Sequence, residues 1–245
     1  MPNLFEQGTV LAFDKPLTWT SFNLVAKVRW LISQHIGGKI KVGHAGTLDP
    51  LATGVLIICT GKATKQIEQL QAGVKEYIAT LKLGATTPSF DLEKEIDATY
   101  PTSHITREGI EQVLQQFVGE IMQTPPVFSA VKVDGKRAYD LARKGKDVEL
   151  KAKPLRIDAI ELLSCDLEQM EVTIRVVCSK GTYIRALARD IGQALQSGAH
   201  LTALRRTRVG EYTINNCFET IEAFEKHLKS IVVTEDDKTS PLHLQ

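Results

Sequence analysis

The sequence predicts a mixed α/β fold, with a central mixed β-sheet flanked by helices. Three observations predict it. Residues 54–60 (GVLIICT) form a short apolar run of strand length, and residues 170–179 (MEVTIRVVCS) alternate apolar and polar side chains. Residues 22–32 instead carry apolar side chains at helical spacing. A chain of 245 residues buries roughly 70 to 75 % of its unfolded surface, so it needs no disulfide or metal to fold.

The expected elements alternate along the chain, as they do when helices pack around one sheet. Strands are expected at 9–13, 54–60, 77–84 and 170–179, and helices at 22–32, 107–117 and 183–195. The apolar stripe of the last helix consists of Ile184, Leu187, Ala188, Ile191 and Leu195. Turn-forming residues at 14–21 and 102–106 predict links between elements.

The charge is balanced overall but uneven along the chain. The charges of the 30 basic and 29 acidic residues nearly cancel, which argues against a protein that binds nucleic acid through its overall charge and without sequence preference. A local basic face is not excluded. Residues 130–156 hold nine basic and four acidic side chains, and a second basic cluster comprises Arg205, Arg206 and Arg208. A solvated face would explain the first cluster alone, but the two together favour a polyanionic partner.

Several classes of site lack the residues they need. The four cysteines form no C-x-x-C pair and no metal-ligand spacing with the six histidines, so we expect reduced thiols, no zinc and no other metal. The first ten residues do not resemble a secretory signal, and no apolar run approaches the roughly 18 residues of a membrane span. We therefore expect a cytoplasmic protein without membrane attachment.

Common catalytic motifs are also absent. Gly54 and Gly61 have six residues between them, and Ala63 follows Lys62, so this segment does not fit the phosphate-binding P-loop. The sequence contains no H-E-x-x-H, G-x-S-x-G or G-x-G-x-x-G, which leaves zinc protease, α/β-hydrolase and dinucleotide enzyme unsupported. It nominates no second carboxylate for a glycosidase.

One acid, Asp49, stands in the unusual segment GHAGTLDPLATG, residues 43–54. Pro50 restricts Asp49 to extended conformations, and the flanking glycines allow tight turns, so the carboxylate is expected on a rigid loop. An arbitrary Asp-Pro pair is usually only a structural turn.

The segment resembles the signature of the TruB family of tRNA pseudouridine synthases, which isomerise uridine 55 in the tRNA T loop. Further motifs follow in the family's order over residues 9–215. They are DKP with TS at 14–21, KEY at 75–77, TPPVFSAVKVDGKRAYDLAR at 124–143, CSKGTYIRALARDIG at 178–192 and HLTALRRTRVG at 200–210. This resemblance implies the pseudouridine synthase fold and outweighs the structural-turn interpretation of Asp49.

The resemblance also implies roles for individual residues. Asp49 is the catalytic aspartate, Tyr77 the aromatic side chain that stacks on the flipped base, and Arg185 the ion-pair partner of Asp49. His44 helps to extrude the target uridine, and Leu204 is a hydrophobic wall of the pocket. An enzyme that must reach a glycosidic bond inside stacked RNA takes the base out and holds it between aromatic and apolar surfaces, which suits these residue types.

Further residues are assigned to RNA binding and to support. The basic segment at about 126–153 is expected to be an RNA-clasping hairpin inserted in the catalytic domain, and its Lys136, Arg137, Arg143 and Lys144 would meet phosphates. Lys15 and Pro16 are expected to give structural support.

The expected organisation is one catalytic domain over 1–230 and a tail over 231–245, without the PUA domain of many relatives. Two departures from the family pattern stand out. Thr18 occupies a position that is usually glycine, so the local turn is expected to differ from that of the family. Residues 84–95 (GATTPSFDLEKE) match only in part, which leaves Asp91 a weak candidate for an RNA contact.

The predicted function is a metal-free, cofactor-free tRNA pseudouridine synthase that acts as a monomer on the T arm. Asp49 would add to C6, attack C1′ or remove the 2′ proton, three paths that the sequence leaves open. Two alternatives are a tRNA-binding or tRNA-folding protein whose catalysis is secondary or lost, and a synthase of this fold with another RNA target. The set of Asp49, Tyr77 and Arg185 argues against a pure binder, which does not need it.

Overall fold

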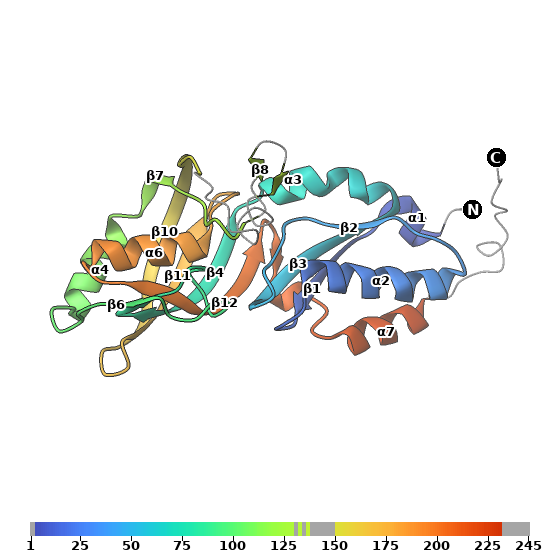
Figure 1. The fold of residues 1–245 in the computed structure, drawn as a ribbon. Helices are drawn as coiled ribbons and strands as arrows, with labels where there is room; N and C mark the ends of the chain where they lie inside the picture. Colours follow the sequence, from blue (N-terminus) through green and yellow to red (C-terminus); the bar gives the residue numbers. More distant parts are fainter. Residues whose placement is uncertain (1–2, 130–131, 134–135, 138–149, 232–245) are drawn as a thin grey trace. The chain divides into compact units, whose positions relative to one another are not determined.

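The computed structural model describes residues 3–129, 132–133, 136–137 and 150–231. The chain divides into two compact units, which we describe separately. Unit 1 comprises residues 1–73 and 206–245, and unit 2 comprises residues 74–205 (Figure 1). The strand β12 (Ala199–Val209) contributes residues to both units.

Unit 1 is built around the long apolar strand β3. Its elements are α1 (Leu4–Gly8), β1 (Val10–Lys15), α2 (Ser21–Ile36), β2 (Val42–His44), β3 (Ala52–Thr60), η1 (Gly61–Gln66), α3 (Ile67–Ala72), β13 (Tyr212–Thr213), η2 (Ile214–Asn216) and α7 (Ile221–Ser230). β3 pairs antiparallel with β1, and its C-terminal residues 58–60 also pair antiparallel with β2. From Val55 to Thr60 every β3 side chain is buried, which explains why this strand reads as a continuous apolar run.

Two helices of unit 1 lie side by side and close one core. Leu24, Val25, Val28 and Leu31 of α2 are buried, as their helical spacing predicts, and they share a cluster with Phe224 of α7. Lys27 and Glu225 join the two helices at 3.4 Å (Figure 1). The N-terminus of α2 is fixed by Thr20, whose hydroxyl accepts from the backbone N–H of Asn23.

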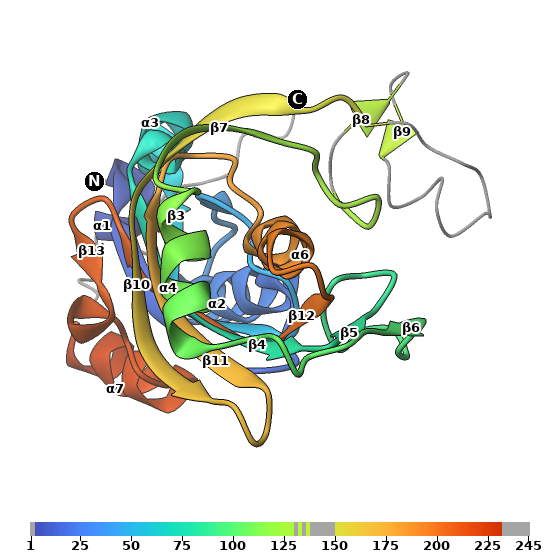
Figure 2. The same ribbon diagram turned by 90° about the vertical axis from the view of Figure 1, so that its left-hand side faces the viewer.

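Unit 2 is a twisted antiparallel sheet with helices packed against it. Its elements are β4 (Lys75–Leu83), β5 (Ala85–Thr86), β6 (Ala98–Thr99), α4 (Arg107–Gln115), β7 (Gly119–Gln123), β8 (Lys132–Val133), β9 (Lys136–Arg137), β10 (Lys153–Asp166), β11 (Glu171–Cys178) and α6 (Ile184–Ala194). β4, β11, β10 and β7 pair in that order, each antiparallel to the next. The strands curve around α4 and α6 (Figure 2).

The expected mixed α/β fold with flanking helices is confirmed. The predicted alternation of β11 is present, because its residues 172, 174, 176 and 178 are buried and Thr173 and Arg175 are not. The strands β10 and β12 were not expected from the sequence. In the part of the chain that the structure describes, no helix has the length and apolar character needed to cross a membrane.

Candidate active site

The residue Asp49 lies in a tight turn between β2 and β3, held by hydrogen bonds on both sides. The backbone N–H of Ala52 donates to the carbonyl of Asp49 at 3.0 Å. The buried Ser21 hydroxyl accepts from the Leu48 N–H at 2.8 Å and donates to the Leu48 carbonyl at 3.0 Å. The Asp49 side chain is half-buried on this fixed backbone. The rigid loop that the Asp-Pro segment predicts is therefore present.

The neighbouring loop before α2 binds the same turn. The Thr18 N–H donates to the Pro50 carbonyl at 2.8 Å. Thr18 has a φ of 68°, a left-handed conformation that a β-branched residue rarely adopts. The chain therefore keeps here the backbone that glycine would favour, although the sequence has threonine.

Arg206 secures the turn from a third direction. Its guanidinium donates to the carbonyl of Val55 at 2.8 Å, of Gly46 at 3.0 Å and of Thr47 at 3.4 Å. The Arg206 side chain is 2 % exposed. The expectation that Arg206 belongs to a surface cluster for a polyanion is therefore wrong. The sequence alone gives no signal for this burial, because nothing in it distinguishes Arg206 from Arg205 and Arg208, which are half-exposed on the same strand.

Lys15 is fully buried beside this turn. Its ammonium donates to the carbonyls of Pro16 at 2.8 Å and Trp19 at 2.6 Å. Burial lowers the Lys15 pKa from 10.5 to about 8, against the opposing charge of Asp49 and with a smaller contribution from the positive charge of Arg206. The contacts join Lys15 to the loop before α2, and the supporting role of Lys15 and Pro16 stays a prediction.

His44 is the last residue of β2, and the positive charge of Arg206 acts on its ring. Burial lowers the His44 pKa below its usual value, and the positive charge of Arg206 lowers it further. Its Nδ1 is buried and has no hydrogen-bond partner among the described residues. The ring is therefore neutral at pH 7.

In unit 2, Arg185 is buried near the start of α6 and joined to the loop after β5. Its Nε lies 3.7 Å from an Asp91 carboxylate oxygen, and its Nη1 donates to the Ser89 carbonyl at 3.2 Å. Asp91 is 6 % exposed, which is unsuited to the RNA contact considered for it. Sequence reasoning missed this pairing, because 93 residues separate the partners along the chain and no local pattern links them.

Arg185 and Arg189 also bind residues 124–128, where the expected insertion begins. Arg185 donates to the Phe128 carbonyl at 2.9 Å, and Arg189, one helical turn later, donates to the Thr124 carbonyl at 3.1 Å. The Gln123 side-chain amide exchanges two hydrogen bonds with the Tyr183 backbone. The start of the insertion is thus tied to α6.

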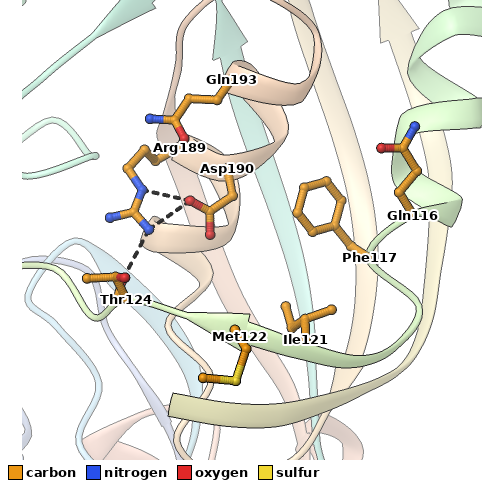
Figure 3. A pocket seen from close by; sticks show the side chains of 8 residues that line it. All are labelled: Gln116, Phe117, Ile121, Met122, Thr124, Arg189, Asp190 and Gln193. Atoms are coloured by element: carbon orange, nitrogen blue, oxygen red, sulfur yellow. Dashed lines mark hydrogen bonds and ion pairs between the residues drawn. The ribbon is translucent and has the colours of Figure 1, made fainter. Parts of the chain in front are cut away.

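A hollow of about 520 Å³ opens beside this attachment. Figure 3 shows Arg189 held between Asp190 and the Thr124 carbonyl, with Phe117, Ile121 and Met122 across from them. Burial raises the pKa of the Asp190 carboxyl, and the adjacent Arg189 opposes that rise. None of the predicted site residues lines this hollow.

The remaining predicted residues fall in three places. Tyr77 is buried on β4, where it pairs with Val176 of β11, and Leu204 is half-buried on β12. The backbones of Lys136 and Arg137 form β9, which pairs with β8 as a short hairpin. Arg143 and Lys144 lie outside the described residues. Asp49 and Arg185 belong to different units, so their predicted ion pair stays a prediction.

No group of three or more histidine, cysteine, aspartate or glutamate side chains is suited to a metal within the described ranges. Around the Asp49 turn, Lys15 and Arg206 instead donate to backbone carbonyls. The arrangement therefore offers a half-buried carboxylate on a fixed turn, with two buried cations beside it.

Comparison with known proteins gives matches over nearly the whole chain. Residues 34–184 match the model of the TruB family pseudouridylate synthase N-terminal domain, and residues 185–242 match that of the tRNA pseudouridylate synthase B C-terminal domain. The chain is 71 % identical to tRNA pseudouridine synthase B of Phocaeicola vulgatus, over 91 % of this chain and 94 % of that protein. It is 51 % identical to the protein of the same name from Flavobacterium johnsoniae, over 93 % and 99 %.

A solved structure agrees in fold. The chain matches one in the crystal structure of a Cbf5-Nop10-Gar1 complex with a TM-score of 0.63 and 34 % identity. The match covers 85 % of this chain and only half of the length of that one. With the family models spanning residues 34–242 and the Asp-bearing turn in place, the chain belongs to the TruB family of pseudouridylate synthases.

Proposed function

We propose that this protein is a tRNA pseudouridine synthase that converts uridine 55 of the T loop to pseudouridine. The observation that carries the proposal is the Asp49 turn, whose backbone is bonded at Leu48, Asp49 and Pro50 within the segment that the family model covers. The relatives named tRNA pseudouridine synthase B support tRNA as the substrate class.

The reaction is an isomerisation that needs no cofactor to balance. The N1–C1′ glycosidic bond breaks, the uracil rotates, and C5 bonds to C1′. C5 loses its proton and N1 gains one, so the product has the atoms of the substrate. Asp49 acts as an ionised carboxylate, by addition to C6, attack on C1′ or removal of the 2′ proton.

The other residues handle the flipped base. Tyr77 supplies an aromatic face and Leu204 an apolar wall, which are the surfaces that hold an extruded base. His44, neutral at pH 7, helps to extrude the uridine. Arg185 orients the Asp49 carboxylate as its ion-pair partner, and Asp91 fixes the Arg185 side chain.

The tRNA is bound through its T arm. Lys136, Arg137, Arg143 and Lys144 of the insertion meet phosphates, and the T loop is read by shape and by its splayed bases. The attachment of residues 124–128 to α6 supports a defined position for the start of this insertion. A monomer, a cytoplasmic location and a single catalytic domain over 1–230 stay predictions.

The test is to incubate the protein with unmodified tRNA and to map pseudouridine by carbodiimide treatment and reverse transcription. A stop at position 55 is the expected result. The Asp49→Asn variant should make no pseudouridine but still bind tRNA, because the amide keeps the size of the side chain and loses its charge. Asp158→Asn is the matched control, because Asp158 lies on β10 in a surface ion pair with Arg156.

Two outcomes would contradict the proposal. Turnover by Asp49→Asn would remove Asp49 from the chemistry. Binding of tRNA by an inactive wild-type protein would favour the binding-protein alternative.

Arg185→Lys is expected to lose most activity, because a point charge cannot reproduce the guanidinium fork. Full activity of that variant would contradict the role given to Arg185.

A further inference from the structure

The strand residue Arg206 binds the chain on both sides of Asp49. Gly46 and Thr47 precede the aspartate and Val55 follows it, and all three offer their carbonyl oxygens to one guanidinium. A planar group with five fixed N–H donors can join three acceptors in this way, whereas an ammonium is a single point. Arg206 thus closes the segment 46–55 into a loop of fixed width.

The backbone of Arg206 is equally close to this segment. Gly54 has a φ of 103°, and a Cβ placed on it would lie 2.1 Å from the Arg206 carbonyl oxygen. Only glycine permits this approach, because any side chain would overlap the neighbouring strand. The main chain and the side chain of Arg206 therefore both meet the Asp49 segment.

Burial excludes two simpler roles for Arg206. A phosphate contact needs an accessible guanidinium, but the side chain is 2 % exposed. Direct contact with the reacting base is excluded by the same burial, and its Nε, Nη1 and Nη2 atoms each donate to a backbone carbonyl. What remains is an effect exerted through the loop.

The charge of Arg206 reaches the same site. It lowers the pKa of both Lys15 and His44, and Asp49 is the strongest opposing charge on Lys15. A buried cation is costly unless a negative charge lies near it. Arg206, Lys15 and Asp49 therefore form one group of charges around the turn.

We propose that Arg206 is a positioning residue for the reaction, which sets the place of the Asp49 carboxylate by holding both ends of its loop. This inference rests on the proposed function. A displacement of about 1 Å at a reacting group costs about 100-fold in rate. Removal of the three hydrogen bonds should therefore lower the rate of the chemical step far more than the affinity for tRNA.

The experiment compares Arg206→Lys and Arg206→Met with Arg29→Lys. Arg29 of α2 is the matched control, because it also donates from a guanidinium to a backbone carbonyl, that of Val42 at 3.3 Å. The measurements are the single-turnover rate on unmodified tRNA, the Kd for tRNA, the melting temperature, and hydrogen exchange at the Leu48 and Ala52 amides, which are bonded inside the turn.

For Arg206→Lys we expect a rate about 100-fold lower, a Kd within about threefold of wild type, and faster exchange at both amides. Arg29→Lys should keep the wild-type rate. A near wild-type rate in Arg206→Lys despite loosened amides would overturn the inference. So would a rate loss that merely follows the unfolded fraction, or loss of folding in both Arg206 variants. An inactive wild-type protein would instead overturn the proposed function, and this inference with it.

Discussion

Single residues in this protein adopt conformations and charge states that the sequence does not announce. Thr18 has left-handed backbone, and Lys15 is buried as a cation with its ammonium on two carbonyl groups. Lys15 ends β1 and Thr18 lies in the loop that follows it, next to the Asp49 turn. Strain and buried charge are commonly stored at functional sites, where the surrounding structure maintains them.

Replacing Thr18 with glycine should stabilise the protein. The left-handed backbone costs a β-branched residue about 1 to 2 kcal/mol, and the greater freedom of glycine in the unfolded chain offsets about half of that gain. We expect the free energy of unfolding to rise by about 0.5 to 1 kcal/mol in denaturant titration. Thr53→Gly, within β3 and without positive φ, should lower it instead. A destabilised Thr18→Gly would show that the threonine side chain matters more than its backbone.

Lys15 should make stability depend on pH. Its pKa is about 8 in the folded protein and near 10.5 when unfolded, so between these values the unfolded chain binds more protons. The free energy of unfolding of wild type, minus that of Lys15→Met, should therefore rise from pH 8 to pH 10.5 and stay level below pH 8. A difference that falls over this range would contradict the lowered pKa of Lys15.

Among the elements, those with a clear apolar period could be predicted, and those with an interrupted period could not. The stripes of α2 and α6 are buried as expected. β10 was missed because bulges between Ile157 and Ala159 and between Leu162 and Ser164 shift its alternation. β12 was missed because its arginines read as a surface cluster, although one of them is core.

The same distinction holds for the candidate site. The Asp49 turn could be predicted, because proline and glycine restrict its backbone locally. The partners Arg206 and Asp91 could not, because each depends on a contact across a long stretch of chain. Charged side chains that enter the interior leave no periodic signal, so sequence patterns place them on the surface by default.

The close approach of β3 to Arg206 predicts a strong effect of Gly54→Ala. The new Cβ would overlap a carbonyl oxygen at 2.1 Å and would take an unfavourable φ. We expect a loss of at least about 3 kcal/mol in unfolding free energy. Gly37→Ala is the control, because Gly37 also has positive φ, at 67°, but a Cβ placed on it would have nothing within 4 Å. This variant should lose only about 1 kcal/mol of unfolding free energy. Equal losses in both variants would rule out the backbone contact as the cause.

For the molecule as a whole, the uneven charge predicts how RNA binding responds to salt. Neutralising Lys136, Arg137, Arg143 and Lys144 together should weaken tRNA binding and reduce the slope of log K against log salt. The expected reduction is about 0.7 to 0.9 for each phosphate that the variant no longer neutralises. Neutralising the exposed Lys226 and Lys229 of α7 should change the slope less per charge. A slope unchanged by the fourfold variant would place the RNA elsewhere.

The order in which the chain is made gives Arg206 a further importance. Unit 1 is interrupted in sequence, because roughly 130 residues of unit 2 separate its first part from Arg206. A ribosome adding about 5 to 20 residues per second needs several seconds or more to cross that stretch. During this interval the Asp49 segment exists without the guanidinium that secures it, so the Asp49 turn can be completed only after unit 2 has been synthesised.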